Sequence, residues 1–142
     1  MKIKGWTILF HPIFDRQWQE LIANVKQIKS RLASSEYVKH PQVKLFAAVT
    51  IVIEQKIPQD PLASYFALKK PLNRYCRVKK MGLPSRYRLF FKVFKEQKVI
   101  IILWLGFPRK DGDKKDCYQV FRKMLNRGKF PQSLADIEDE LN

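Results

Sequence analysis

The sequence predicts an α+β domain: a small twisted antiparallel sheet with an N-terminal helical hairpin and a C-terminal helix. Three observations support this fold class. Two amphipathic helical patterns lie close together near the N-terminus, an alternating β-hairpin follows in the second half, and a third helical pattern comes after it. A chain of 142 residues is long enough to bury one sizeable core. We therefore expect a single domain over residues 1–142.

The helical hairpin follows a short apolar segment, residues 6–10, which we expect to form an edge strand. Apolar side chains recur at spacings of three and four over residues 14–32, which predicts an amphipathic helix with Pro12 near its first turn. The same spacing returns between Pro41 and Pro58, so a second helix is predicted there, stopped by Pro58. The apolar stripes of these two helices must cover a sheet or each other.

Residues 86–107 form the most strongly patterned stretch of the chain and read as a β-hairpin. One face of the first arm carries the residues that we expect in the core, Tyr87, Leu89, Phe91 and Val93. The other face interleaves cations with aromatic side chains, Arg86, Arg88, Phe90, Lys92 and Phe94. The second arm, residues 99–105, is apolar almost throughout, which predicts a central strand covered on both faces.

Two further segments connect the helices to this hairpin. Residues 58–74 contain three prolines, and we expect this irregular segment to run over the surface, anchored by Phe66 and Leu68. Residues 75–81 alternate as another strand. Because the helices are expected on one face of the sheet, the other face would stay open. It would carry the cations Arg77, Lys79, Arg86, Arg88 and Lys92.

A third helix is predicted after the hairpin, beginning near residue 115 or 116 and ended by Gly128. Its apolar stripe would bury Tyr118, Phe121, Met124 and Leu125. Residues 129–142 form an acidic C-terminal tail or a last short helix, because Ser133 and Asp136 have the spacing of a capping box.

The net charge of +15 is extreme for a chain of this size, and it is unevenly distributed. Residues 69–98 hold 11 lysines and arginines against one glutamate, a net +10, whereas residues 129–142 carry a net −3. A hydrophobic content of 46% excludes a disordered chain. Because such concentrated charge repels itself, we expect it to serve a polyanionic partner.

Other classes of function find little support in the sequence. No stretch reaches the roughly 18 apolar residues of a membrane-spanning helix, and the N-terminus lacks a signal-peptide pattern, so we expect a cytoplasmic protein. Cys76 and Cys117 show no metal-ligand spacing, and free thiols are expected. Glu96-Gln97-Lys98 has the E-x-K pattern of metal nucleases, but it falls on a predicted turn without a partner aspartate. We expect neither a metal nor another cofactor.

Several motifs together resemble one family of bacterial toxins. They are Gly5-Trp6, His11-Pro12, Arg77-Val78-Lys79, the runs 86–91 and 98–104, and the spaced pattern from Arg109 to Gly128. The combination is similar to the YhaV toxins of the RelE superfamily and covers most of the chain. The resemblance implies a RelE-like toxin fold and an endoribonuclease (an mRNA interferase) that inhibits translation. It also implies silencing by a cognate antitoxin similar to PrlF.

Proteins of this superfamily resemble one another in cleaving RNA without a metal, using the 2′-hydroxyl of the substrate as nucleophile. This chemistry needs a base, cations that stabilise the charge developing on phosphorus, and an acid for the leaving 5′-oxygen. Arg88 is the first candidate for stabilising the transition state, because a guanidinium in mid-strand suits a phosphate. The resemblance implies that Arg109 shares this phosphate.

Other candidate roles stay open. Lys79 either binds phosphate or acts as the base, and Tyr118 is either a core residue or a stacking or acid residue. RNA would be bound by Arg77, Lys79, Arg86, Phe90, Lys92 and Lys115. His11 is expected to be structural, although the resemblance keeps it as a candidate.

Two other functions remain as alternatives. One is a toxin of related fold that acts on a protein target such as gyrase, and the other is a non-catalytic module that binds RNA or the ribosome. The predicted cluster of cations favours a nuclease over the first alternative but does not separate it from the second. The sequence leaves open whether the chain forms a homodimer.

Overall fold

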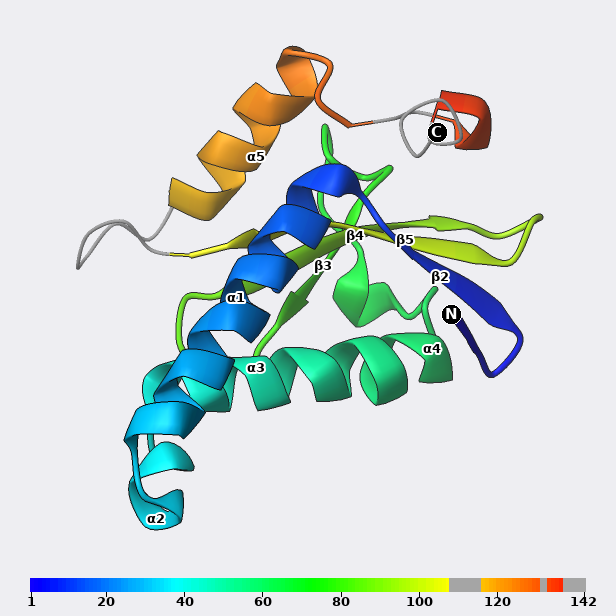
Figure 1. Ribbon diagram of the computed structural model, residues 1–142. Coiled ribbons are helices and arrows are strands. Elements are labelled where there is room, and N and C mark those ends of the chain that lie inside the picture. Colours follow the sequence, from blue (N-terminus) through cyan, green and yellow to red (C-terminus); the bar gives the residue numbers. More distant parts are fainter. Residues whose placement is uncertain (108–115, 131–132, 137–142) are drawn as a thin grey trace.

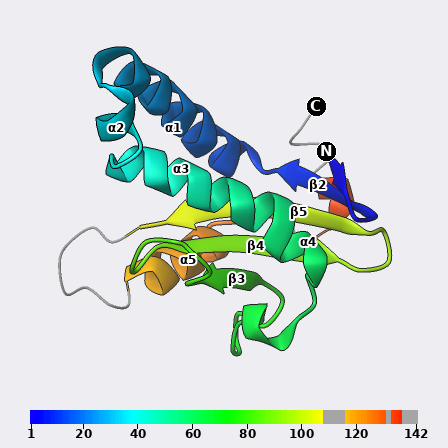
Figure 2. The same ribbon diagram turned by 90° about the horizontal axis from the view of Figure 1, so that it is seen from below.

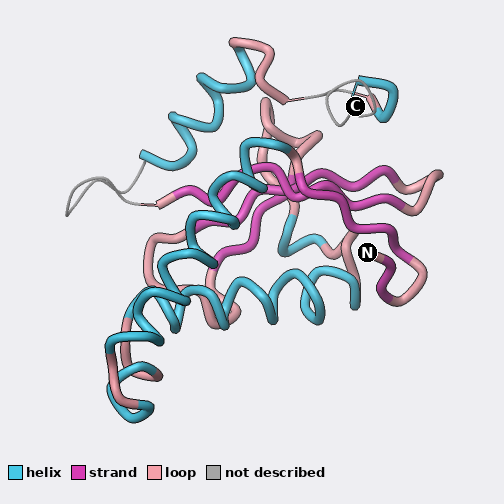
Figure 3. Tube along the Cα trace, in the orientation of Figure 1, coloured by secondary structure: helices cyan, strands magenta, loops and turns pink. Residues whose placement is uncertain are grey.

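The computed structural model describes residues 1–107, 116–130 and 133–136. Five strands form one sheet in the order β1-β2-β5-β4-β3. The strands are β1 (Lys2–Ile3), β2 (Trp6–Phe10), β3 (Cys76–Lys79), β4 (Arg88–Phe94) and β5 (Val99–Gly106). The helices are α1 (Pro12–Arg31), α2 (Ser34–Tyr37), α3 (Pro41–Ile51), α4 (Ile57–Gln59) and α5 (Asp116–Asn126). The predicted α+β class is confirmed, with the sheet in the middle of the molecule (Figure 3).

The sheet is mixed rather than wholly antiparallel. β4 and β5 form the predicted antiparallel hairpin, but β2 pairs with β5 in parallel, from Thr7 opposite Val99 to Phe10 opposite Ile102. The prediction that β2 is an edge strand is wrong, because β1 folds back onto it. The connection is a two-residue turn in which Lys4 and Gly5 have φ angles of 51° and 85°, a conformation typical of tight β-hairpins.

α1 and α3 cover one face of the sheet, as their apolar stripes predicted. Each helix begins with a His-Pro pair in which the histidine caps the first turn. Nδ1 of His11 accepts the Ile13 N–H at 3.1 Å, and Nδ1 of His40 accepts the Gln42 N–H at the same distance. His11 is only 4% exposed, so its position agrees with the expected structural role.

The second predicted helix continues through Pro58 instead of stopping before it. A π-helical segment, Val52–Lys56, joins α3 to α4, and the Ile57 N–H bonds to the Val52 carbonyl. Proline has no N–H, and its ring collides with the carbonyl four residues earlier in a regular α-helix. The wider π turn directly before Pro58 accommodates that collision.

α5 covers the opposite face of the sheet, so the expectation of an open face is wrong for its centre. Figures 1 and 2 place α3 and α5 on opposite sides of the strands. Phe121 of α5 is fully buried and stacks on Phe90 of β4, with ring centroids 4.2 Å apart. A register shift opposite Phe90 and Phe91 brings Leu103 and Trp104 into this same second core cluster. The apolar second arm predicted this double coverage correctly.

The C-terminal end of α5 follows the predicted pattern. Gly128 has φ +69°, the Lys129 N–H bonds to the Met124 carbonyl, and the Gly128 N–H bonds to the Leu125 carbonyl. Beyond it, the Asp136 N–H donates to Ser133 Oγ at 3.3 Å, as the capping pattern predicted. None of the helices in the described residues is long and apolar enough to cross a membrane.

Candidate active site

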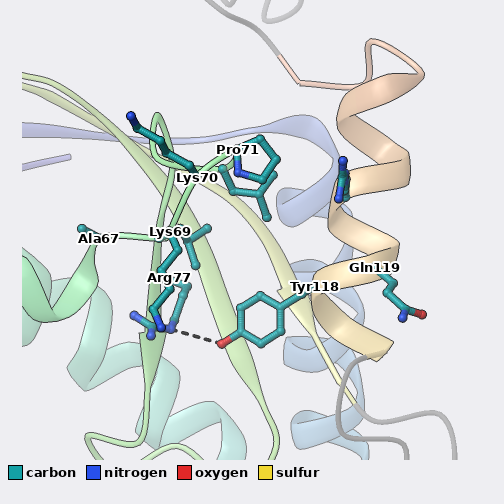
Figure 4. Close-up of a pocket in the computed structure, with 10 residues that line it drawn as sticks. Ala67, Lys69, Lys70, Pro71, Arg77, Tyr118 and Gln119 are labelled. Carbon is teal, nitrogen blue, oxygen red and sulfur yellow. Dashed lines mark hydrogen bonds between the residues drawn. The ribbon is translucent and has the colours of Figure 1, made fainter.

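Three side chains from three elements meet at the phenol oxygen of Tyr118. Nε of Arg77, on β3, and Nε of Arg88, on β4, each donate a hydrogen bond to this oxygen at 3.2 Å. Tyr118 itself comes from the first turn of α5. Figure 4 shows the bond between Arg77 and Tyr118 across the gap between strand and helix. The sequence placed both arginines on one face, and the structure brings them to one atom.

Strand register brings the cations together. β3 and β4 are antiparallel, with Lys79 directly opposite Arg88 and Arg77 opposite Phe90. Because side chains two residues apart share a face, Arg77 and Lys79 project on the same side of β3. Lys79 is exposed, whereas Arg77 and Arg88 are half-buried. Like charges directly opposite one another destabilise a sheet, so this arrangement is better explained by binding than by folding.

Each guanidinium is fixed by a second hydrogen bond. Nη1 of Arg77 donates to the Tyr65 carbonyl at 2.9 Å, and Nη1 of Arg88 donates to the Tyr87 carbonyl at 2.8 Å. A guanidinium held at two of its nitrogens is oriented before a ligand arrives, which reduces the entropy lost on binding. The orientation of the pair suits the binding of an oxyanion.

Tyr118 belongs to the core and to the site at the same time. Its ring meets the ring of Phe90 edge to face, with centroids 5.9 Å apart, and the residue is half-buried. Burial alone would raise the pKa of the phenol. The hydrogen bonds and positive charges of Arg77 and Arg88 outweigh burial and hold the pKa of Tyr118 below its usual value of 10.0. The packing agrees with a core residue, whereas a role as an acid or a stacking residue stays a prediction.

A cavity of about 640 Å³ opens beside this cluster, between residues 67–72 and α5. Arg77 and Tyr118 form one of its walls (Figure 4). The other lining residues are Ala67, Leu68, Lys69, Lys70, Pro71, Leu72, Gln119 and Arg122. Sequence reasoning did not select this loop or Arg122, although Lys69 and Lys70 open the basic stretch of residues 69–98.

Two predicted RNA-binding residues are buried, and this corrects their assignment to an open surface. Phe90 is fully buried beneath α5. Lys92 is 7% exposed, with Nζ 4.5 Å from the centroid of the Tyr75 ring and 5.5 Å from that of Phe94. Loss of hydration, and then the charge of Arg74, lowers the pKa of Lys92 below 10.5. The alternating pattern of β4 does not predict that α5 and residues before β3 pack over these two side chains.

The remaining candidates lie elsewhere or outside the described residues. Arg86 is half-buried in the turn before β4, where its φ angle is 70°. Arg109 and Lys115 lie outside the described residues. His11 contacts the ring of Phe130, with centroids 5.1 Å apart. Within residues 1–107, 116–130 and 133–136, no three His, Cys, Asp or Glu side chains are grouped as a metal site would require.

Comparison with known proteins agrees with this picture. Residues 8–142 match the family model described as a toxin with endonuclease activity, of a toxin–antitoxin system. The ribonuclease toxin YhaV of Escherichia coli strain K12 is 36% identical over 147 residues, covering 98% of this chain and 94% of that protein. Toxin YhaV of Escherichia coli O6:H1 strain CFT073 is 35% identical over the same length and with the same coverage.

Among solved structures, the RelBE2 toxin–antitoxin complex of Mycobacterium tuberculosis has a TM-score of 0.45 at 16% identity, covering 72% of this chain and 98% of that chain. The isolated RelE toxin of Escherichia coli has a TM-score of 0.44 at 15% identity, covering 86% and 97%. The extent of the family match and of the YhaV similarity decides the assignment. The chain belongs to the YhaV family, the toxins with endonuclease activity of toxin–antitoxin systems.

Proposed function

We propose that this chain is an endoribonuclease that cleaves mRNA, free or ribosome-bound, and so inhibits translation. The observation that supports this most strongly is the convergence of Arg77 and Arg88 on the oxygen of Tyr118. Two preorganised cations beside an acidified phenol would supply two of the three things that phosphodiester cleavage needs, charge stabilisation and an acid, and the base is a separate group. The K12 relative carries the name ribonuclease toxin, which supports RNA as the substrate.

In the proposed reaction, the 2′-oxygen of the RNA attacks the adjacent phosphorus, and the bond from phosphorus to the 5′-oxygen breaks. The products are a 2′,3′-cyclic phosphate and a free 5′-hydroxyl. The proton of the 2′-hydroxyl passes to a base, and the leaving 5′-oxygen takes a proton from an acid. Arg88 binds the non-bridging phosphate oxygens, where negative charge accumulates in the transition state.

Tyr118 is the proposed acid. When the phenol gives its proton to the 5′-oxygen, the phenolate remains between two guanidinium groups. Both hydrogen bonds strengthen as charge develops on the oxygen, so they stabilise the product of proton transfer more than the resting phenol. Proton exchange with water then restores the phenol.

Further cations would bind the RNA around this centre. Lys79 is exposed opposite Arg88 and would bind the scissile phosphate or its neighbour. Arg109 would share the phosphate with Arg88, and Lys115 would bind RNA, on the basis of the family resemblance. Arg86, in the turn that leads into β4, would bind the RNA backbone near the site.

The proposed protein partner is a cognate antitoxin similar to PrlF. Membership of a toxin–antitoxin family supports an antitoxin as the partner of this chain. An acidic, partly apolar segment of the antitoxin would cover the cluster of Arg77, Lys79 and Arg88, because that surface combines exposed charge with the cavity beside Tyr118. Occupying the cluster would exclude RNA.

The test uses purified chain with naked RNA in the presence of a metal chelator and, separately, with translating ribosomes in a magnesium buffer. We expect cuts that leave cyclic phosphate and 5′-hydroxyl ends. Arg88→Ala should lower the cleavage rate about 10²–10³-fold and largely keep RNA binding. Lys123→Ala, which changes an exposed cation of α5 outside the cavity, is the matched control. Binding without cleavage in both assays would leave a non-catalytic module, and gyrase inhibition without cleavage would favour a protein target.

A further inference from the structure

The cavity between residues 67–72 and α5 differs from the cluster at Tyr118 in having an apolar interior and a charged rim. Leu68 is 8% exposed and belongs to the second core cluster, against which Leu72 also packs. Lys69, Lys70 and Arg122 are exposed. No acidic side chain of the described residues lines this cavity. A volume of about 640 Å³ is typical of a pocket for a small ligand.

The loop that forms this cavity is held by backbone hydrogen bonds and does not need a ligand to take its shape. The Leu68 N–H bonds to the Tyr75 carbonyl at 3.3 Å, and the Tyr75 N–H bonds to the Leu72 carbonyl at 3.0 Å. The Leu72 N–H bonds to the Lys69 carbonyl at 2.9 Å. The cavity is therefore largely preformed, which favours specific binding.

A second cavity, of about 630 Å³, is lined by the same loop and the residues that follow it, 70–75, and by residues 122–130. It shares four residues with the first cavity and adds the cation Arg74. The shared residues are Lys70, Pro71, Leu72 and Arg122. Lys70 and Arg122 therefore lie where the two cavities meet, with a mainly apolar cavity on one side and one of mixed polarity, lined by Leu125 and Phe130 but also by Asn73 and Asn126, on the other.

We propose that these cavities are two successive nucleotide subsites for single-stranded RNA leading away from the cleavage site. This inference rests on the proposed function. One base enters the first cavity, beside Arg77 and Tyr118, and the next base enters the second. The phosphate that links them is bound by Lys70 and Arg122 at the boundary. In a polynucleotide, bases that carry both an apolar face and polar edges alternate with phosphates, as two cavities flank the cations here, whereas an acidic peptide would need no cavity on both sides of each charge.

The subsite next to Tyr118 should make cleavage depend on the base that it holds. The test uses short RNAs that contain a mapped cut site and carry one abasic ribose at successive positions. For the natural chain, removing the base that fills the first cavity should lower kcat/KM about 10-fold, the usual scale for one stacked base. In Leu72→Ser, whose apolar wall is reduced, the same abasic substitution should have an effect of less than about 3-fold.

Arg122→Ala is the second variant. Because Arg122 is exposed, this substitution leaves the side chains of the core unchanged. It should lower the affinity for every RNA regardless of sequence. It should also reduce the number of counterions released on binding, measured from the salt dependence of the affinity, by about one. Lys123→Ala, the adjacent exposed cation, should do neither. Thermal unfolding confirms that each variant is folded. An abasic effect that is equal in Leu72→Ser and the natural chain, or an Arg122→Ala variant that binds RNA normally, would overturn the proposal.

Two further results separate this inference from the proposed function. The abasic series is also measured as equilibrium binding to Arg88→Ala, which requires no cleavage. Base-dependent binding there would support the subsites even if the natural chain did not cut RNA. If the cavity variants alter affinity for the antitoxin and leave RNA cleavage and binding unchanged, the cavities belong to the antitoxin and the subsite assignment is wrong.

Discussion

Lys79 and Arg88 lie directly opposite each other on the antiparallel strands β3 and β4. Two like charges in this position repel each other, and the proposed binding site would explain why the fold bears this cost. Lys79→Gln should therefore keep or raise the thermal unfolding midpoint, by about 1–3 °C, while it weakens RNA binding. Circular dichroism follows the unfolding, and the gain should shrink at high salt.

Lys26→Gln on the outer face of α1 is the matched control. Lys26 is also exposed, but it lies on a helix and therefore has no cross-strand partner. It should leave both the midpoint and RNA binding unchanged. A fall in the midpoint of Lys79→Gln that exceeds the change in the control would mean that Lys79 stabilises the fold, contrary to this account.

The pH dependence of cleavage should report on Tyr118. An acid must be protonated to act, so the rate should fall as the pH rises through the pKa of Tyr118, which lies below 10.0. Arg77→Gln removes one of the two hydrogen bonds that lower this pKa, so the fall should move to higher pH. Single-turnover rates across the alkaline range measure the shift.

Tyr65→Phe is the control for this experiment, since the hydrogen bond from Arg77 goes to the backbone carbonyl of residue 65, which the substitution keeps. Its pH profile should match that of the natural chain. If Tyr118→Phe keeps the same alkaline fall in rate, the titrating group is another residue and the assignment of Tyr118 as the acid fails.

Lys92 should prove to be a buried residue and not an RNA contact. Lys92→Met should leave RNA affinity and its salt dependence unchanged, whereas Arg77→Met should reduce both. Stability should also respond to pH. The unfolded chain keeps this proton up to about 10.5, but the folded chain releases it at lower pH, so the natural chain gains stability as pH rises through that window.

The Lys92→Met variant lacks this gain, so the difference in unfolding free energy between the two proteins should shift in favour of the natural chain as pH rises. Denaturant titrations at neutral and alkaline pH measure it. A salt slope for RNA binding that falls by one ion in Lys92→Met would show instead that Lys92 reaches a phosphate.

The antitoxin complex should be sensitive to salt. Charge pairing between an acidic segment and the cluster of Arg77, Lys79 and Arg88 would weaken as ionic strength rises. Titration calorimetry of the chain with the proposed PrlF-like antitoxin, at low and high salt, measures the effect. An affinity that stays flat across this range would exclude the cluster as the main docking surface.

Local patterns predicted the elements well because the side-chain periodicity of helices and hairpins depends on residues that are close together in the sequence. The period of apolar side chains placed α1, and the alternation of residues 86–94 placed β4 with the correct two faces. The parallel pairing of Thr7 with Val99 could not be predicted, because it joins segments far apart in the sequence. The apolar stripe of α5 showed that the helix needs a partner, but not which face of the sheet supplies it.

The same limit applies to the site. Alternation placed Arg77 and Arg88 on one face, and only the packing of α5 brings Tyr118 between them. That packing also buries Phe90, which alternation alone had placed beside the cations on an exposed surface. The cavity lined by residues 67–72 depends on how an irregular segment folds back toward α5, which no periodic pattern describes.

The central claim is that Arg88 and Tyr118 act as one unit on one phosphate. A double-mutant cycle of Arg88→Ala and Tyr118→Phe, measured as single-turnover RNA cleavage, tests it most directly. We predict that each single variant is strongly impaired and that the double variant is about as slow as the slower single one. Losses that multiply, or a Tyr118→Phe variant that cleaves at the natural rate, would contradict the account.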